Sequence, residues 1–227
     1  MKKLKNNFKK NFFENNAWQN SFYVCGIDEV GRGCLAGPLV TATVILPHNT
    51  NCELLKDSKI LTPQQRQIAY DWITNNCFYS VSIFSHKQVD RLNIYQATLQ
   101  CMKKSLLQLL QILPFDLKQI KYVLVDAMPL NLSGCNFCDH LEVNFFDKGE
   151  SKSNSIAAAS IVAKVTRDLL MKKMSTIFPD FNFDENKGYG TSNHMDVLRK
   201  HGPTIIHRKT FMPKVFRGEV KEQVTIF

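Results

Sequence analysis

Two carboxylates stand at the end of an apolar run, and their position limits how the chain can fold. Residues 22–28 read as a strand that ends on Asp28, Glu29 follows it, and a Gly-Arg-Gly turn covers residues 31–33. A β-branched run over residues 35–46 comes next, so the turn predicts an antiparallel hairpin. An Asp-Glu pair before glycines is also typical of a solvated turn, and this segment alone leaves the two interpretations open.

Strand and helix patterns alternate along the rest of the chain, which predicts a single α/β layered domain with a mixed sheet. Capping residues mark several helix starts: Thr62-Pro63, Ser85 with Gln88, and Thr191. The expected elements are a helix from residue 62, a strand over 77–83, a helix from 85 to about 113, strands over 120–125 and 141–146, a helix over 155–177 and a short helix from 191 to 202.

The length and composition suit one domain with short ends. The chain has 227 residues, 44% of them hydrophobic, and no apolar run approaches the ~20 residues of a membrane-spanning helix. The basic N-terminus has no apolar stretch behind it, which is unlike a secretory signal. We expect an Asn/Lys-rich arm over residues 1–20, the main domain over 21–213 and a tail over 214–227, in a cytoplasmic protein.

The seven cysteines are an odd number without a framework spacing, which favours a reducing compartment and no disulfides. Cys135 and Cys138 form a lone CxxC, with Asp139-His140 after it. A zinc site needs four ligands and no second pair follows, so zinc or redox chemistry is the less favoured interpretation.

The formal net charge is +9, and the basic residues gather near the two ends of the chain. A charge of this size indicates a polyanionic partner, with nucleic acid first and a membrane surface second. Basic ends also serve solubility alone, so the charge by itself is weak support for a binding function.

Acidic residues end three separate strand patterns. Asp28 ends the first, Asp126 ends a later one, and Glu150 follows another. Ligand groups gather at strand ends in α/β sheets, and carboxylate oxygens suit Mg²⁺ or Mn²⁺. Each residue alone could be a turn or cap residue, but together they predict a cage for one or two ions. Because neighbouring strand residues face opposite sides, Asp28 and Glu29 can face one ion only if the strand breaks at Glu29.

Several strings occur in one order along the chain: residues 26–33, 35–38, 57–59, 93–94, 123–126, 148–150, 157–161, 163–168, 187–191, 207–208 and Phe211. In these strings the chain resembles bacterial ribonuclease HII, of the ribonuclease H-like superfamily, over roughly residues 22–213. The resemblance implies a ribonuclease H-like α/β fold with a central mixed five-stranded sheet flanked by helices.

The resemblance also implies a function. The family is a metal-dependent endonuclease that cuts RNA in RNA–DNA hybrids and incises duplex DNA 5′ of a single ribonucleotide. It leaves 5′-phosphate and 3′-hydroxyl ends, and two Mn²⁺ or Mg²⁺ ions are expected as cofactors. A monomer that binds these duplexes and no membrane is implied.

Position by position, the resemblance assigns roles to the residues. Asp28, Glu29 and Asp126 match metal-binding carboxylates. The turn of Gly31, Arg32 and Gly33 matches the segment that senses the ribose 2′-hydroxyl and holds the phosphate, and Tyr189 matches a tyrosine that stacks at the RNA–DNA junction.

One position departs from the family. Glu150 stands where the family usually has Asp after Lys-Gly, and it adds a methylene to the side chain. We expect activity to be kept with a changed metal preference, toward Mn²⁺, and Asp147 is the alternative ligand if Glu150 points away. The segment between Asp126 and Lys148 is also longer than usual.

The remaining candidates have structural alternatives. Ser58 and Lys59 could contact phosphate or form a solvated loop, and Arg208 with His207 could touch the DNA backbone or buttress the site. Asp168 follows Lys164 by four residues, the spacing of a structural ion pair. A binding protein with lapsed catalysis and the sister enzyme ribonuclease HIII are the rival functions, although the Gly-Arg-Gly turn and the short arm favour HII.

Overall fold

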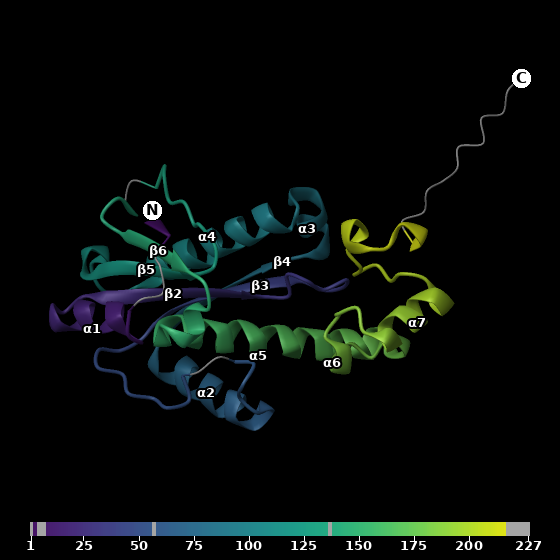
Figure 1. Ribbon diagram of the computed structural model, residues 1–227, viewed down its shortest axis with the longest axis horizontal. Coiled ribbons are helices and arrows are strands. Elements are labelled where there is room, and N and C mark those ends of the chain that lie inside the picture. The colour runs from purple at the N-terminus through teal and green to yellow at the C-terminus, as the bar shows by residue number, and fades with distance from the viewer. Residues whose placement is uncertain (1, 4–7, 56–57, 136–137, 217–227) are drawn as a thin grey trace, which may run out of the picture.

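A central sheet with helices on both faces forms the protein (Figure 1). The computed structural model describes residues 2–3, 8–55, 58–135 and 138–216. The strands are β1 (Lys2–Lys3), β2 (Tyr23–Val30), β3 (Leu39–Ile45), β4 (Phe78–Phe84), β5 (Ile120–Asp126) and β6 (Glu142–Phe146). The helices are α1 (Phe12–Gln19), α2 (Pro63–Asn76), α3 (His86–Leu92), α4 (Ile94–Ile112), α5 (Asn154–Ile177), α6 (Phe183–Asn186) and α7 (Ser192–His201).

The strand order is β1-β6-β5-β2-β3-β4. β2, β5 and β6 are parallel neighbours, whereas β2–β3 and β3–β4 are antiparallel, so the sheet is mixed. The expected sheet of five strands is confirmed, and the two-residue β1 adds a parallel edge strand beside β6.

Each face of the sheet has its own core. Helix α5 packs on β2 and β3 with α2 outside it, and α4 covers β2, β3 and β4 on the opposite face (Figure 1). On the α5 side, Val40, Ala42 and Val44 meet an alanine-rich stretch of the helix that begins at Ala157. Small side chains allow the long helix to lie close to the strands. This close packing positions the turn Gly149–Ser151, which directly precedes the helix.

The predicted hairpin of β2 and β3 is confirmed, with pairing from Cys25↔Ile45 to Val30↔Val40. The second strand begins at Leu39, later than expected, because residues 35–38 have other partners. Leu35 N–H donates to the carbonyl of Gly188, and Ala36 forms a single bridge with His207. The turn after β2 is therefore fastened to the C-terminal part of the chain.

The helix expected from residue 85 to about 113 is two helices. Asn93 lies between α3 and α4 with φ of 61°, a left-handed conformation that interrupts helical hydrogen bonding. Its side chain accepts the N–H of Gln96 and so caps α4. The periodic apolar pattern continues through this break, which is why the pattern alone did not reveal it.

Part of the N-terminal arm is helical and packs on the sheet. Residues 12–19 form α1, which packs against the sheet through Phe13 and Ala17. Glu14 is buried, and its Oε1 accepts the hydroxyl of Ser153 at 2.5 Å and the N–H of Ser155 at 3.1 Å. A carboxylate at the N-terminus of α5 accepts hydrogen bonds from free helix N–H groups, and its negative charge interacts favourably with the positive end of the helix dipole.

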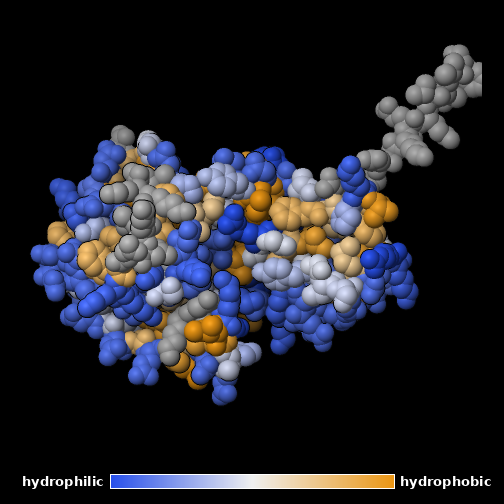
Figure 2. All heavy atoms as spheres, in the orientation of Figure 1, coloured by the Kyte–Doolittle hydropathy of each residue, from blue (hydrophilic) through white to orange (hydrophobic). Residues whose placement is uncertain are grey.

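The face seen in Figure 2 is mainly hydrophilic, with apolar side chains gathered over the C-terminal segment. Ile205 and Val215 are about four-fifths exposed there (80% and 82%). Among the residues that the structure describes, no helix has the length and apolar character needed to cross a membrane.

Candidate active site

The ends of β2 and β5 bring two of the predicted carboxylates together. The two strands are parallel neighbours, and Ile27 pairs with Val125, so Asp28 and Asp126 come next on each strand. Neighbouring strands lie about 4.8 Å apart. Ile27 and Val125 both pack into the core on the α4 side, so alternation turns Asp28 and Asp126 together toward the α5 side.

Glu29 lies at the same edge, but the strand does not break there. The break that would turn Glu29 to the same side as Asp28 is absent, because β3 keeps pairing through Glu29↔Thr41 and Val30↔Val40. Strand alternation alone would place Glu29 on the opposite face of β2, but pairing with β5 ends before it, and the charge of Glu29 adds to the burial that raises the pKa of both Asp28 and Asp126. Its side chain remains within hydrogen-bonding reach of Asp28, and its Oε1 lies 3.3 Å from the guanidinium of Arg32.

Glu150 completes the acidic group. It lies on the short turn Gly149–Ser151 ahead of α5, is buried, and raises the pKa of Asp28 through its charge. Asp126 fastens this turn to β5, because its Oδ1 accepts the N–H of Gly149 at 2.6 Å. Asp147, the alternative ligand, is exposed at the preceding turn. The geometry therefore favours Glu150 over Asp147 as the fourth carboxylate.

The ionised forms of the carboxylates are disfavoured by burial and by their mutual repulsion. Burial raises the pKa of Asp28 well above its usual range, and the charges of Glu29 and Asp126 raise it further. Burial likewise raises the pKa of Glu29 and of Asp126. Within the described chain, Oε2 of Glu29 is buried without a hydrogen-bond partner. Desolvated carboxylates with an unsatisfied oxygen fit a hard divalent cation, which would neutralise the repulsion.

Two of the carboxylates have protein partners. Asp28 Oδ1 accepts the N–H of Glu29 at 2.7 Å, and Lys59 lies 3.7 Å from Glu150. In the described part of the chain, no three Asp, Glu, His or Cys side chains already form a metal cage.

A buried arginine shapes the glycine turn. Arg167 of α5 donates to the carbonyls of Pro38 (2.9 Å), Ala36 (3.2 Å) and Lys187 (2.8 Å). Gly31 has φ of 91°, and a Cβ there would come within 2.3 Å of Nε of Arg167. Gly31 is thus required by both backbone conformation and packing.

The role of Arg167 was not predicted from the sequence, although a signal exists. Ala163, Arg167 and Met171 follow one another at a spacing of four on the buried face of α5. A charged residue in such an apolar series indicates a buried cation that needs fixed acceptors.

Two predicted substrate contacts have internal partners instead. Arg208 is fully buried and donates to the carbonyls of Gly37 and Arg32, and burial lowers its pKa to about 10. The buttressing alternative for Arg208 is therefore favoured over a direct phosphate contact. Ser58 is also buried, and its hydroxyl lies 2.7 Å from that of Ser160.

Other predicted residues do lie at the surface of the site. The side chain of Lys59 is 79% exposed beside Glu150. Tyr189 is partly exposed in the loop before α7, and its hydroxyl interacts with the buried thiol of Cys34, next to the glycine turn. Lys164 and Asp168 form the predicted structural pair at 2.8 Å. Asp57 lies outside the described residues.

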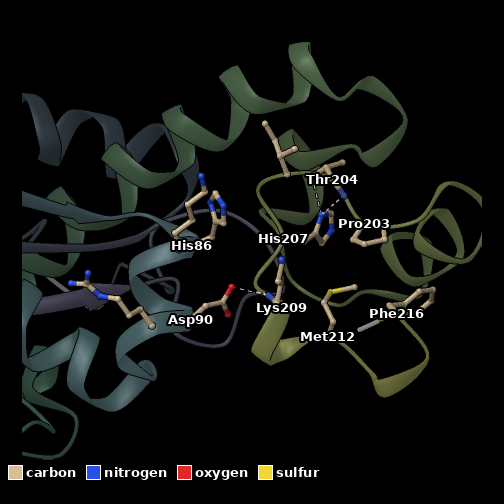
Figure 3. Close-up of a pocket in the computed structure, with 11 residues that line it drawn as sticks. His86, Asp90, Pro203, Thr204, His207, Lys209, Met212 and Phe216 are labelled. Carbon is tan, nitrogen blue, oxygen red and sulfur yellow. Dashed lines mark hydrogen bonds between the residues drawn. The ribbon is translucent and has the colours of Figure 1, made fainter. Parts of the chain in front are cut away.

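Two further features lie away from the carboxylates. A cavity of about 880 Å³ between α3 and the C-terminal segment is lined by residues such as His86, Lys209 and Phe216 and by none of the four acids (Figure 3). In the lone CxxC, burial raises the pKa of Cys138 to about 11, which keeps this thiol protonated at neutral pH.

Known proteins that resemble this chain in sequence identify its family. The Ribonuclease HII family model matches residues 25–214. Ribonuclease HII of Lactobacillus gasseri is 45% identical over 204 residues, covering 88% of this chain and 75% of that relative. Ribonuclease HII of Alkaliphilus metalliredigens is 40% identical over 206 residues, covering 90% and 97%.

Solved structures share the fold. RNase HII in the PCNA:RNase HII complex from Archaeoglobus fulgidus aligns with a TM-score of 0.64 at 26% identity, covering 82% of this chain and 91% of that one. Two others, below 25% identity, show the fold alone. They are ribonuclease H2 of Pyrococcus horikoshii OT3 (TM-score 0.65, 24% identity, covering 83% and 93%) and Bst-RNase HIII in complex with Mn²⁺ (0.60, 20%, 82% and 65%).

The mixed sheet with acidic strand ends defines a nuclease of the ribonuclease H-like class. Within that class, the chain belongs to the ribonuclease HII family, the type 2 ribonucleases H. These enzymes are metal-dependent phosphodiester hydrolases, and the hybrid of RNA and DNA is their substrate class.

Proposed function

We propose that this chain cuts RNA within RNA–DNA hybrids and incises duplex DNA on the 5′ side of a single ribonucleotide, leaving 5′-phosphate and 3′-hydroxyl ends. The observation that carries the proposal is the placement of Asp28 and Asp126 on adjacent strand ends, beside Glu150 and the glycine turn. Two Mg²⁺ or Mn²⁺ ions, held by these acids and Glu29, would activate water and neutralise the leaving oxygen.

The protein's own contribution is recognition and positioning. The 2′-hydroxyl is the group that separates RNA from DNA, and the backbone of Gly31, Arg32 and Gly33 can approach it closely. Arg32 and the exposed Lys59 supply positive charge for the phosphate. The ring of Tyr189 offers a stacking surface that does not depend on base identity.

One assay tests the function. The purified protein is given duplex DNA with a single ribonucleotide, and separately a hybrid with a long RNA strand, each with Mg²⁺ or Mn²⁺. Incision 5′ of the single ribonucleotide supports the proposal. Cutting only in long RNA would instead support a ribonuclease HIII activity, and binding without cutting in either metal would support lapsed catalysis.

Gly33→Ala separates substrate recognition from folding. Among the described residues, nothing lies within 4 Å of a Cβ added at Gly33. We expect the free energy of unfolding to change by less than about 0.5 kcal/mol. Incision at a single ribonucleotide should fall about 10- to 100-fold, because a methyl group would stand between the turn and the sugar. Normal incision by a stable variant would contradict the role of this turn.

Glu150→Asp tests the departure from the family. The longer side chain of Glu150 shifts the carboxylate oxygens by roughly 1 Å. Mg²⁺ requires near-ideal octahedral geometry, so we expect it to tolerate this shift less well than Mn²⁺ does. We expect the Asp variant to raise the ratio of Mg²⁺-supported to Mn²⁺-supported rates by about tenfold. Rates with both metals are compared at saturating metal, and an unchanged ratio would contradict the assignment of Glu150.

The proposal also includes a cytoplasmic monomer that binds duplex nucleic acid. The net charge of +9 favours such a partner. The Archaeoglobus fulgidus relative was solved with PCNA, so a sliding-clamp partner is a reasonable second component to test. Sedimentation of the free protein and of its mixture with a duplex tests the monomer directly.

A further inference from the structure

Two histidines lie buried together in the C-terminal part of the protein. His194 is near the start of α7, and His207 is in the segment that follows the helix. Their Nε2 atoms are 3.0 Å apart, and both rings pack against Phe181 and Phe183. Neither histidine contacts the four carboxylates, so the proposed hydrolysis leaves the pair unexplained.

The hydrogen bonds of the two histidines run from the N–H of Thr204 to the carbonyl of Tyr189, and these two backbone groups fix the direction of each bond. The N–H of Thr204 can only donate, and it lies 2.9 Å from Nδ1 of His207 (Figure 3). Neutral His207 therefore carries its proton on Nε2 and donates to Nε2 of His194. His194 then carries its proton on Nδ1 and donates to the carbonyl of Tyr189 at 2.8 Å.

Burial keeps this chain of bonds in one protonation state. It lowers the pKa of His194, and it lowers the pKa of His207 to about 4, with the neighbouring histidine adding to the effect. His86 on α3 is the other titratable group whose charge acts on His207. At neutral pH both rings are neutral, and each has one donor and one acceptor already committed.

The carbonyl at the end of this chain belongs to a loop with two left-handed backbone residues. Lys187 and Gly188, which precede Tyr189, both have positive φ, 52° and 81°. The N–H of Tyr189 donates to the carbonyl of Asn186 at 2.9 Å, and its carbonyl also accepts the N–H of Thr191 at 2.8 Å. His194 adds a side-chain bond to that carbonyl, and the Tyr189 hydroxyl interacts with Cys34.

We propose that His194 and His207 are positioning residues that hold Tyr189 for stacking on the substrate. His207 sets the tautomer of His194, and His194 in turn fixes the carbonyl of Tyr189. The inference rests on the proposed stacking role of Tyr189. It adds to that role a buried series of hydrogen bonds that runs from the N–H of Thr204 through His207 and His194 to the carbonyl of Tyr189.

Two substitutions of His194 provide a matched pair. In His194→Asn the amide nitrogen takes the place of Nδ1 and can still donate to Tyr189, whereas in His194→Gln the amide lies near Nε2 and loses that bond. Both variants lose the ring against Phe181 and Phe183 equally. His207→Asn is a second route, because it keeps the acceptor for Thr204 N–H and removes the donor to His194.

Stacking is read by fluorescence. Each substitution is combined with Asp126→Asn, and the protein is bound to a duplex with 2-aminopurine beside a single ribonucleotide. Tyr189→Ala should remove the quenching and weaken binding by about tenfold. His194→Gln and His207→Asn should lose most of the quenching and weaken binding about threefold, while His194→Asn should stay near the parent. Circular dichroism and thermal melting confirm that each variant is folded.

The outcomes distinguish this inference from the proposed function. Unchanged quenching in Tyr189→Ala would overturn the stacking role itself. If Tyr189→Ala loses the quenching but folded His194→Gln and His207→Asn keep it, the positioning role is overturned and the stacking role stands. Equal loss in His194→Asn and His194→Gln would also overturn the inference, because the bond to Tyr189 would then not be the feature that matters.

Discussion

Asp126→Asn is expected to reduce cleavage of ribonucleotide-containing duplex by about 10³-fold or more. Loss of a ligand charge removes several kcal/mol of transition-state stabilisation, and each 1.36 kcal/mol corresponds to a factor of ten. The amide oxygen can still accept the N–H of Gly149, so the turn that carries Glu150 stays attached to β5. Single-turnover rates at saturating protein measure the effect without interference from duplex binding.

The same variant should be more stable than the parent when metal is removed. Burial and neighbouring charges raise the pKa of Asp126, so its ionised form costs folding free energy at neutral pH. With EDTA present, Asp126→Asn should therefore melt above the parent. Added Mn²⁺ should raise the melting temperature of the parent, by mass action, and leave the variant nearly unchanged. Normal cleavage by Asp126→Asn, or an equal response of both proteins to Mn²⁺, would contradict the site.

Gly26→Ala is expected to give the largest loss of stability. Gly26 lies on β2 two residues before Asp28, and a Cβ there would meet the α5 backbone, 2.1 Å from the carbonyl carbon of Ser155. Backbone cannot rotate away as a side chain can, so the strand and helix must separate. We expect a cost of about 3 kcal/mol or more, which lowers the melting temperature by roughly 10 °C in a protein of this size.

The close approach at Gly26 also serves the site. It places Asp28 on β2 near the N-terminal end of α5, where Glu150 lies. Chemical denaturation measures the stability, with Gly33→Ala as the control for a glycine that has room for a methyl group. If Gly26→Ala is as stable as that control, the packing of β2 on α5 differs from the structure described here.

Much of the site could be predicted because its residues lie where local patterns end. Asp28 and Asp126 each follow a compact apolar run, and parallel strands bring such ends to one edge. The caps of Thr62 and Ser85 were predicted for the same reason, since their partners lie three residues away. Local chemistry determines these features, so a single sequence is enough to find them.

The features that the sequence left open depend on contacts between distant segments. The strand continues past Glu29 because β3 pairs with it, and that pairing depends on the hairpin register rather than on Glu29 itself. Arg208 is buried against the carbonyls of residues 32 and 37, far away in the sequence. The hydroxyl of Ser58 is hydrogen-bonded to that of Ser160, 102 residues away. From the sequence alone, a charged or polar residue in a loop is predicted to lie at the surface, because its distant partners are not visible there.

Diffraction from crystals soaked in Mn²⁺ tests the central claim most directly, because the anomalous signal locates the ions without reference to activity. The account predicts an ion within about 2.0–2.6 Å of oxygens from both Asp28 and Asp126, with Glu150 or Glu29 completing its ligands. Ions bound only elsewhere, or a site left empty at Mn²⁺ concentrations that support cleavage, would contradict it.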